Sequence, residues 1–141
     1  MVCAAFFGAA AAIALPAGVV RPKSIPALTE TRWELLALSV EGCRRLARMP
    51  EAVCACGTAL LPGGWIGLAA RQLRAERVVS CGLSPRDSLT FSSTTPRPVV
   101  CLQRALLRPD GTLVEPQELF VGHLSDPPED LLAAVGLGLL L

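Results

Sequence analysis

Six cysteines carry the most versatile chemistry in this sequence: Cys3, Cys43, Cys54, Cys56, Cys81 and Cys101. Cys54 and Cys56 lie two residues apart in an apolar run, so on a strand they share one face. Cys81 and Cys101 fall on other expected strands, and four converging thiolates can enclose a zinc ion. Structural zinc sites, however, place Cys-x₂₋₄-Cys spacings on turns, and unpaired cysteine packs as a small buried hydrophobe. We therefore predict no metal and six reduced thiols in a reducing compartment, with zinc or redox chemistry as the alternatives.

The glycine pair Gly63-Gly64 is a second candidate, in the segment GTALLPGGW between an expected strand and an expected helix. Backbone N–H groups at the start of a helix can bind an anion. Together with Arg86 and Arg104, this turn is a candidate site for a small anion or a nucleotide. The segment lacks lysine and both phosphate-loop spacings, so a purely structural turn is the competing interpretation, and no cofactor is predicted.

Polar side chains gather in the part of the chain that we expect to form a β-hairpin: Asp87, Gln103, Glu115, Gln117 and Glu118. Gln103 and Arg104 interrupt an otherwise apolar strand, which indicates either an inward polar network or an edge strand. Arg104 or Arg108 can pair across the hairpin with Glu115 or Glu118. His123, the only histidine, follows the hairpin and is interpreted as a surface residue. The serines lack the G-x-S-x-G pattern, so no catalytic constellation emerges.

The elements that would position these residues begin with a βαβ unit. Residues 52–61 and 78–81 are continuous apolar runs, as is typical of buried parallel strands. Between them, residues 65–75 have the periodicity of a helix, so the two strands are expected to be parallel neighbours. Residues 33–48 also have helical spacing and are predicted to form one helix, capped by Thr29 or Thr31.

The second half of the chain predicts a hairpin and a terminal helix. A short strand is expected at 88–92, and residues 98–107 and 112–121 should pair around the turn Arg108-Pro109-Asp110-Gly111. Pro116 in the return strand predicts an edge position or a bulge. Residues 131–141 form an apolar helix pattern that follows acids and prolines suited to a first helical turn.

Bulk properties set the fold class. The chain has 141 residues, of which 52% are hydrophobic and 18% are charged, so it can build one α/β domain over residues 1–141. We predict a small sandwich of two or three layers that contains the βαβ unit, the appended hairpin and the C-terminal helix. The net charge of +1 gives no field that would attract nucleic acid.

Residues 1–20 carry no charge and allow three interpretations. A secretory signal would need a basic start, which is missing. A membrane helix needs about 20 apolar residues, and Pro16 and Gly18 interrupt this run. The favoured interpretation is a buried element of the domain.

The stretches RVVSCGLSPRDSLTFSS and VVCLQRALLRPDGTLVEPQEL resemble a group of short bacterial α/β proteins of unassigned function. The likeness covers residues 77–119, under a third of the chain. The same region is faintly similar to the strand that closes the central domain of Mur-type ligases. Their phosphate loop is absent here, so the resemblance implies no ligase activity.

Three functional hypotheses follow. The high apolar fraction and the apolar ends of the chain favour a cytoplasmic protein that associates with a protein partner or with itself. The second hypothesis is an enzyme or binder of small anions that uses Gly63-Gly64 and the arginines. The third is a membrane-attached or exported protein that uses residues 1–20.

Overall fold

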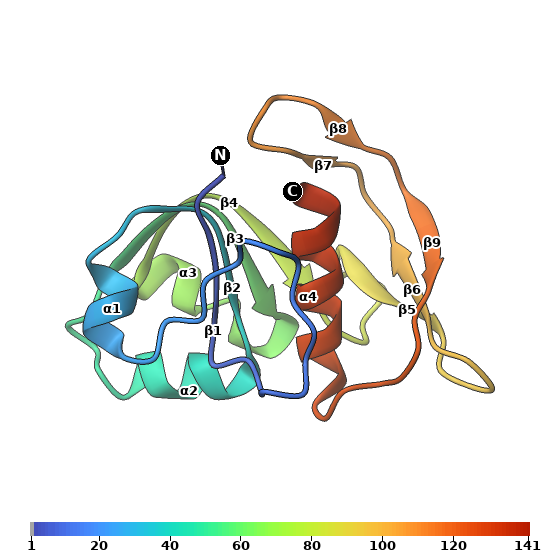
Figure 1. The fold of residues 1–141 in the computed structure, drawn as a ribbon, viewed down its shortest axis with the longest axis horizontal. Coiled ribbons are helices and arrows are strands. Elements are labelled where there is room, and N and C mark those ends of the chain that lie inside the picture. Colours follow the sequence, from blue (N-terminus) through green and yellow to red (C-terminus); the bar gives the residue numbers. More distant parts are fainter. Residues whose placement is uncertain (1) are drawn as a thin grey trace.

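Seven strands form one curled, mostly parallel sheet in the computed structural model, which describes residues 2–141 (Figure 1). The first five strands are neighbours in chain order, and each pair among them is parallel. The last two strands are antiparallel to their neighbours. In order across the sheet, the strands are β1 (Ala4–Phe7), β2 (Trp33–Leu38), β3 (Cys54–Pro62), β4 (Leu73–Cys81), β5 (Leu89–Ser93), β6 (Val99–Leu102) and β9 (Gln117–Phe120).

Helices cover both faces of the parallel part of the sheet. On one face, Leu28, Leu46 and Leu68 pack with buried strand residues in one core cluster. On the other face, Leu132 and Leu137 pack into a second cluster that extends to β5 and β6. The domain is therefore an α/β sandwich of three layers. The helices of the first face are α1 (Ile25–Thr29), α2 (Val40–Ala47) and α3 (Leu68–Arg71), and the second face carries α4 (Pro128–Leu140).

The predicted βαβ unit is confirmed. β3 and β4 are parallel neighbours, and their register runs from Cys54 opposite Leu73 to Pro62 opposite Cys81. The connecting helix is shorter than the sequence pattern suggests: a 3₁₀ turn, η1 (Gly63–Trp65), precedes the single turn α3. Residues 73–77, part of which we assigned to the helix, belong to β4.

The single helix predicted for residues 33–48 is wrong. The first part is strand β2, which lies between β1 and β3 and is buried on both faces, so its leucines serve two cores. Only the second part is helical, as α2. Ser39 begins that helix, because its hydroxyl accepts a hydrogen bond from the Gly42 N–H at 2.8 Å. Neither Thr29 nor Thr31 caps α2; Thr29 ends α1.

In the N-terminal segment β1 is fully buried, whereas residues 8–20 are partly buried or exposed. The favoured interpretation of residues 1–20 as a buried element is therefore confirmed only for Ala4–Phe7. The outer edge of β1 is covered, because Val20 accepts a hydrogen bond from the Phe6 N–H and donates one to the Ala4 carbonyl. Within residues 2–141, no helix combines the length and apolar character needed to cross a bilayer.

The predicted hairpin forms two ladders. β6 pairs with β9 in the main sheet, while β7 (Leu106–Leu107) and β8 (Leu113–Val114) form a separate two-stranded extension. Gly111 closes the predicted turn with a φ of +89°, a conformation that favours glycine. Pro116 lies between β8 and β9, where the ladder is interrupted, as its position in the sequence predicts.

Candidate functional site

Six of the predicted site residues lie around the loop at 82–88, which joins β4 to β5. Gln103 and Arg104, just beyond β6, hold this loop through its carbonyl groups. The Gln103 side-chain amide donates to the carbonyls of Pro85 (3.1 Å) and Asp87 (2.6 Å). Arg104 donates to the carbonyl of Arg86 at 2.8 Å. These two polar residues therefore fix the shape of the loop, and Arg104 does not pair with Glu115 or Glu118 across the hairpin.

Asp87 is the buried member of this group, with 6% of its surface exposed. Its Oδ2 atom accepts a hydrogen bond from the Ser84 N–H at 3.0 Å, which closes the loop. The carboxylate rests against the main chain of Gly63 and Gly82. A Cβ atom on Gly63 would lie 2.6 Å from Asp87 Oδ1, so glycine here makes room for a carboxylate of the protein itself.

A cleft of about 830 Å³ opens at this place, where β3 and β4 end, and Gly64 and Arg86 also line it. Two acids, Asp87 and Glu129, face it. Burial raises the pKa of the neighbouring Cys81 thiol, and the charges of Asp87 and Glu129 raise it further. An anion at Gly63 would meet both carboxylates. The arrangement of Gly63, Gly64, Arg86 and Arg104 thus lends no support to the hypothesis of an anion site at this turn.

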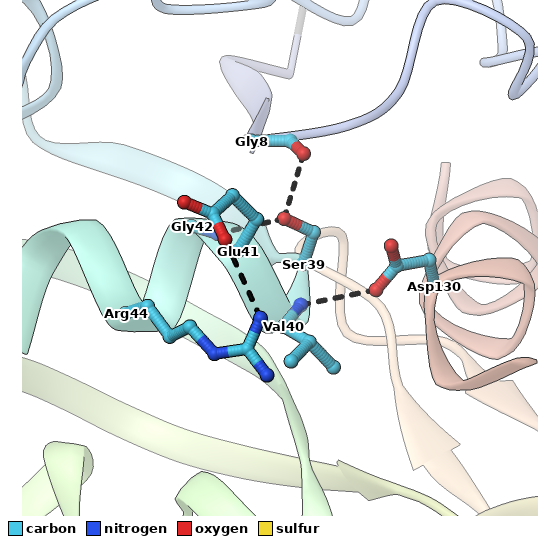
Figure 2. Close-up of polar contacts among 7 residues, drawn as sticks. All are labelled: Gly8, Ser39, Val40, Glu41, Gly42, Arg44 and Asp130. Carbon is cyan, nitrogen blue, oxygen red and sulfur yellow. Dashed lines mark hydrogen bonds and ion pairs between the residues drawn. The ribbon is translucent and has the colours of Figure 1, made fainter. Parts of the chain in front are cut away.

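A second polar junction, which the sequence did not reveal, lies where β1 and β2 end (Figure 2). The Ser39 hydroxyl donates to the Gly8 carbonyl at 2.7 Å, so one side chain joins β1 to α2. Asp130, from the first turn of α4, accepts a hydrogen bond from the Val40 N–H at 3.0 Å. Burial raises the pKa of Asp130, and the bond from Val40 offsets part of this effect. The junction ties both helical layers to the sheet.

We expect Asp130→Asn to raise the melting temperature at pH 7 more than at pH 4. An amide oxygen can still accept the Val40 hydrogen bond and carries no charge. Because the pKa of Asp130 is raised in the folded state, wild-type stability falls as pH rises from the ordinary value of 3.8 through the raised one. Thermal unfolding at both pH values tests this. Asp126→Asn, at an exposed site, is the control, and an equal shift in both variants would contradict the prediction.

The cysteines are unpaired, but they do not converge. Cys54 and Cys56 share the face covered by α1 to α3, as predicted, whereas Cys81 lies in the cluster on the opposite face. Burial raises the pKa of Cys54 to about 11 and that of Cys56 to about 12. Within residues 2–141, no group of three metal-ligating side chains is close enough to hold an ion. The buried thiols therefore serve as small apolar side chains in the two cores.

The acidic residues of the hairpin lie apart from the loop. Glu115, Gln117 and Glu118 are exposed, on or just before β9. The cross-hairpin ion pairs suggested for Arg104 and Arg108 do not form among the described residues. Arg108 instead donates through Nε to the Leu139 carbonyl at 3.0 Å, which attaches the hairpin to the end of α4. His123 is exposed, as expected.

β9 is the open edge of the main sheet and lies at its outer margin (Figure 1). The Val121 N–H donates to the Pro98 carbonyl at 3.1 Å, which marks these residues as a hydrogen-bonded pair. Such pairs alternate along an antiparallel ladder, so Leu119 bonds with Val100. The main-chain groups of Glu118 and Phe120 therefore point away from the sheet.

The edge strand β9 also carries an exposed aromatic side chain. Phe120 exposes 73% of its surface, the largest fraction among the exposed large hydrophobic residues. The guanidinium of Arg97 lies 5.4 Å from the centre of its ring. An uncovered strand edge with an exposed aromatic side chain is a typical site for pairing with another strand.

Comparisons with known protein families, with curated proteins and with solved structures returned no match.

Proposed function

We propose that this chain works as an association domain, in which β9 pairs with β9 of a second copy around a two-fold axis. The supporting observation is the asymmetry of the sheet edges. Val20 occupies the edge of β1, while the main-chain groups of Glu118 and Phe120 remain available on β9. Natural sheets usually protect long open edges, and pairing would use these groups. The unpaired cysteines support a reducing compartment such as the cytoplasm.

The charges along the edge favour a second copy as the partner. An antiparallel pair centred on Leu119 places Glu118 of one protomer opposite Phe120 of the other. Because Arg97 lies over the Phe120 ring, each Glu118 carboxylate then faces the partner's Arg97. The symmetry repeats this contact, so one surface supplies both an acid and a base. Exposed ion pairs contribute only about 0–1 kcal/mol each, so their main effect is to set the register.

Charge reversal tests the proposal. Sedimentation equilibrium over a range of protein concentrations should show a reversible dimer. Glu118→Arg and Arg97→Glu should each weaken it by about tenfold, because a like-charge contact replaces an ion pair twice in the symmetric interface. The double variant should recover most of the affinity. Glu115→Arg makes the same charge change on the same hairpin but off the edge, and should leave the dimer intact.

Proline at position 118 tests the role of the main chain. The Glu118 N–H points away from β6, so Glu118→Pro should abolish dimerisation and leave the internal ladder in place. Circular dichroism would verify the fold of this variant. The proposal fails if the wild-type chain remains monomeric up to about 1 mM, or if the charge swap shows no recovery.

A further inference from the structure

A cleft beneath the β7–β8 extension is the strongest unassigned feature of the molecule. In Figure 1 this extension stands over the sheet near the end of α4. Two adjoining cavities of about 380 and 450 Å³ lie under it. They share Thr58, Arg77 and Leu107, which makes them two ends of one cleft.

The two ends of the cleft differ in chemistry. One end is mainly apolar, with Val79, Leu106, Leu113 and Leu140 in its lining, although Ser88 and Arg104 also line it. The other end is charged and includes Arg32, Glu34, Glu76 and Arg108. An elongated molecule with one charged and one apolar end matches this division.

The sign of the charged end favours an anion. At this end three arginines, Arg32, Arg77 and Arg108, stand against two acids, Glu34 and Glu76. Glu76 is already engaged by Arg32 at 3.2 Å. Its distance to Arg77 is 3.9 Å, and half of the Arg77 side chain remains exposed. Arg77 thus has donors available at the junction of the two ends.

Thr58 supplies the second polar group at this junction. Only 5% of its surface is exposed, and it lines both cavities. Among the described residues, no hydrogen-bond partner is found for its hydroxyl. No fully buried polar side-chain atom in the described residues lacks a partner, so this unpaired hydroxyl is accessible from the cleft. An accessible, unpaired hydroxyl can bind a ligand without first breaking a bond within the protein.

A sharp twist of β3 brings Thr58 to this position. Cys56 packs on the face of α1 to α3, yet Thr58, two residues later, faces Leu106 and Leu140 on the other side. Gly57 lies between them. A Cβ atom there would stand 2.8 Å from the Glu34 carbonyl oxygen, so glycine allows the close approach of β2 at the twist.

We propose that this cleft binds an amphipathic monoanion, a carboxylate with an unbranched apolar chain of about the length of octanoate. The carboxylate accepts hydrogen bonds from Arg77 and Thr58, and the chain lies against Leu106, Leu113 and Leu140. Charge complementarity at one end and apolar surface at the other carry the assignment.

Titration with sodium octanoate tests the proposal, followed by calorimetry and by ¹H–¹³C NMR of the leucine methyl groups. Octanoate should bind in the millimolar range or tighter and shift the Leu106 and Leu113 methyls. Acetate has only the charged group and 1-octanol only the chain, so each should bind at least about tenfold more weakly. Octanoate and octanol binding equally would overturn the proposal, as would no octanoate binding up to about 10 mM.

Two variants locate the site. Arg77→Gln should weaken octanoate binding by about tenfold or more, because it removes the charge and keeps a polar side chain of lesser reach. Thr58→Val keeps the shape and removes the hydroxyl, and should weaken binding by a smaller factor. Arg74→Gln is the control, since Arg74 is exposed on the same strand outside the cleft. Equal affinity in Arg77→Gln and Arg74→Gln would refute the assignment. The dimer variant Glu118→Arg should bind octanoate normally.

Discussion

Replacing Gly42 with alanine is expected to destabilise the protein by about 3 kcal/mol. Gly42 lies in the first turn of α2, directly against the end of β1. An added Cβ atom would stand well under 3.0 Å from the Phe7 carbonyl oxygen. That oxygen belongs to the main chain of β1, and the Cβ atom is fixed to the main chain of α2, so neither can rotate away. The helix would have to move away from the sheet, which would stretch the bonds of Ser39 to Gly8 and of Val40 to Asp130. The intrinsic preference of alanine for helices, about 1 kcal/mol, offsets only part of this cost.

Urea unfolding measures this effect, and α4 offers the matched control. Gly138 is also a helical glycine, but the nearest heavy atom to its added Cβ would be 3.8 Å away, on Pro16. Gly138→Ala should therefore stabilise the protein by about 0.5–1 kcal/mol. Opposite signs for the two substitutions would establish the close approach of α2 and β1. Similar small effects in both would show that this contact does not control stability.

The sequence was most informative where one pattern permits one structure. The runs at 52–61 and 78–81 have strand length, are apolar on both sides and are separated by glycines, and they form the central parallel pair β3–β4. The Arg108–Gly111 turn was readable because proline and glycine each suit a defined turn position. The prolines and acids before residue 131 likewise marked the start of α4.

Residues 33–48 show where pattern alone fails. Leu35, Leu36 and Leu38 fit one face of a helix and also fit a strand buried on both sides. The sheet decides between these structures, because β2 has partners on both edges. Ser39 is a good N-cap residue, and it was the local signal that could have divided the segment correctly.

The polar junctions were harder to foresee, since their partners are far apart in the chain. Gln103 and Asp87 were expected in one region, and the structure places them together. Asp130 meets Val40 across 90 positions, and only the three-layer packing brings them into contact. Thr58 reaches its cleft because β3 twists at Gly57. The pattern of apolar and polar residues in the sequence does not indicate this twist. The resemblance of residues 77–119 to short bacterial proteins stays a prediction.

Gln72→Leu should cost about 2–4 kcal/mol, because it removes the donor that satisfies a buried turn. Gln72 has 4% of its surface exposed, and its side-chain amide donates to the carbonyls of Leu46 (2.8 Å), Met49 (2.9 Å) and Ala52 (3.2 Å). These carbonyls end α2 and lead into β3, so one side chain holds the α2–β3 connection. Leucine has a volume similar to that of glutamine, so this substitution removes the hydrogen bonds while keeping most of the packing.

The glutamate substitution distinguishes this explanation from any other role of the side chain. In Gln72→Glu, a carboxylate would face carbonyl oxygens at neutral pH, so the variant should be less stable than Gln72→Leu at pH 7. On acidification the carboxyl group becomes a donor. Burial against carbonyl oxygens raises its pKa in the folded state, so the deficit relative to wild type should shrink as the pH falls from that raised value to about 4.3, the ordinary pKa of glutamate. Gln117→Leu, at an exposed position on β9, should change the free energy of unfolding by less than about 0.5 kcal/mol. A deficit that does not vary with pH in Gln72→Glu would mean that the three carbonyls do not depend on this amide. The connection between α2 and β3 would then owe its shape to its apolar packing, in which Leu46 is buried, and to its own main-chain hydrogen bonds.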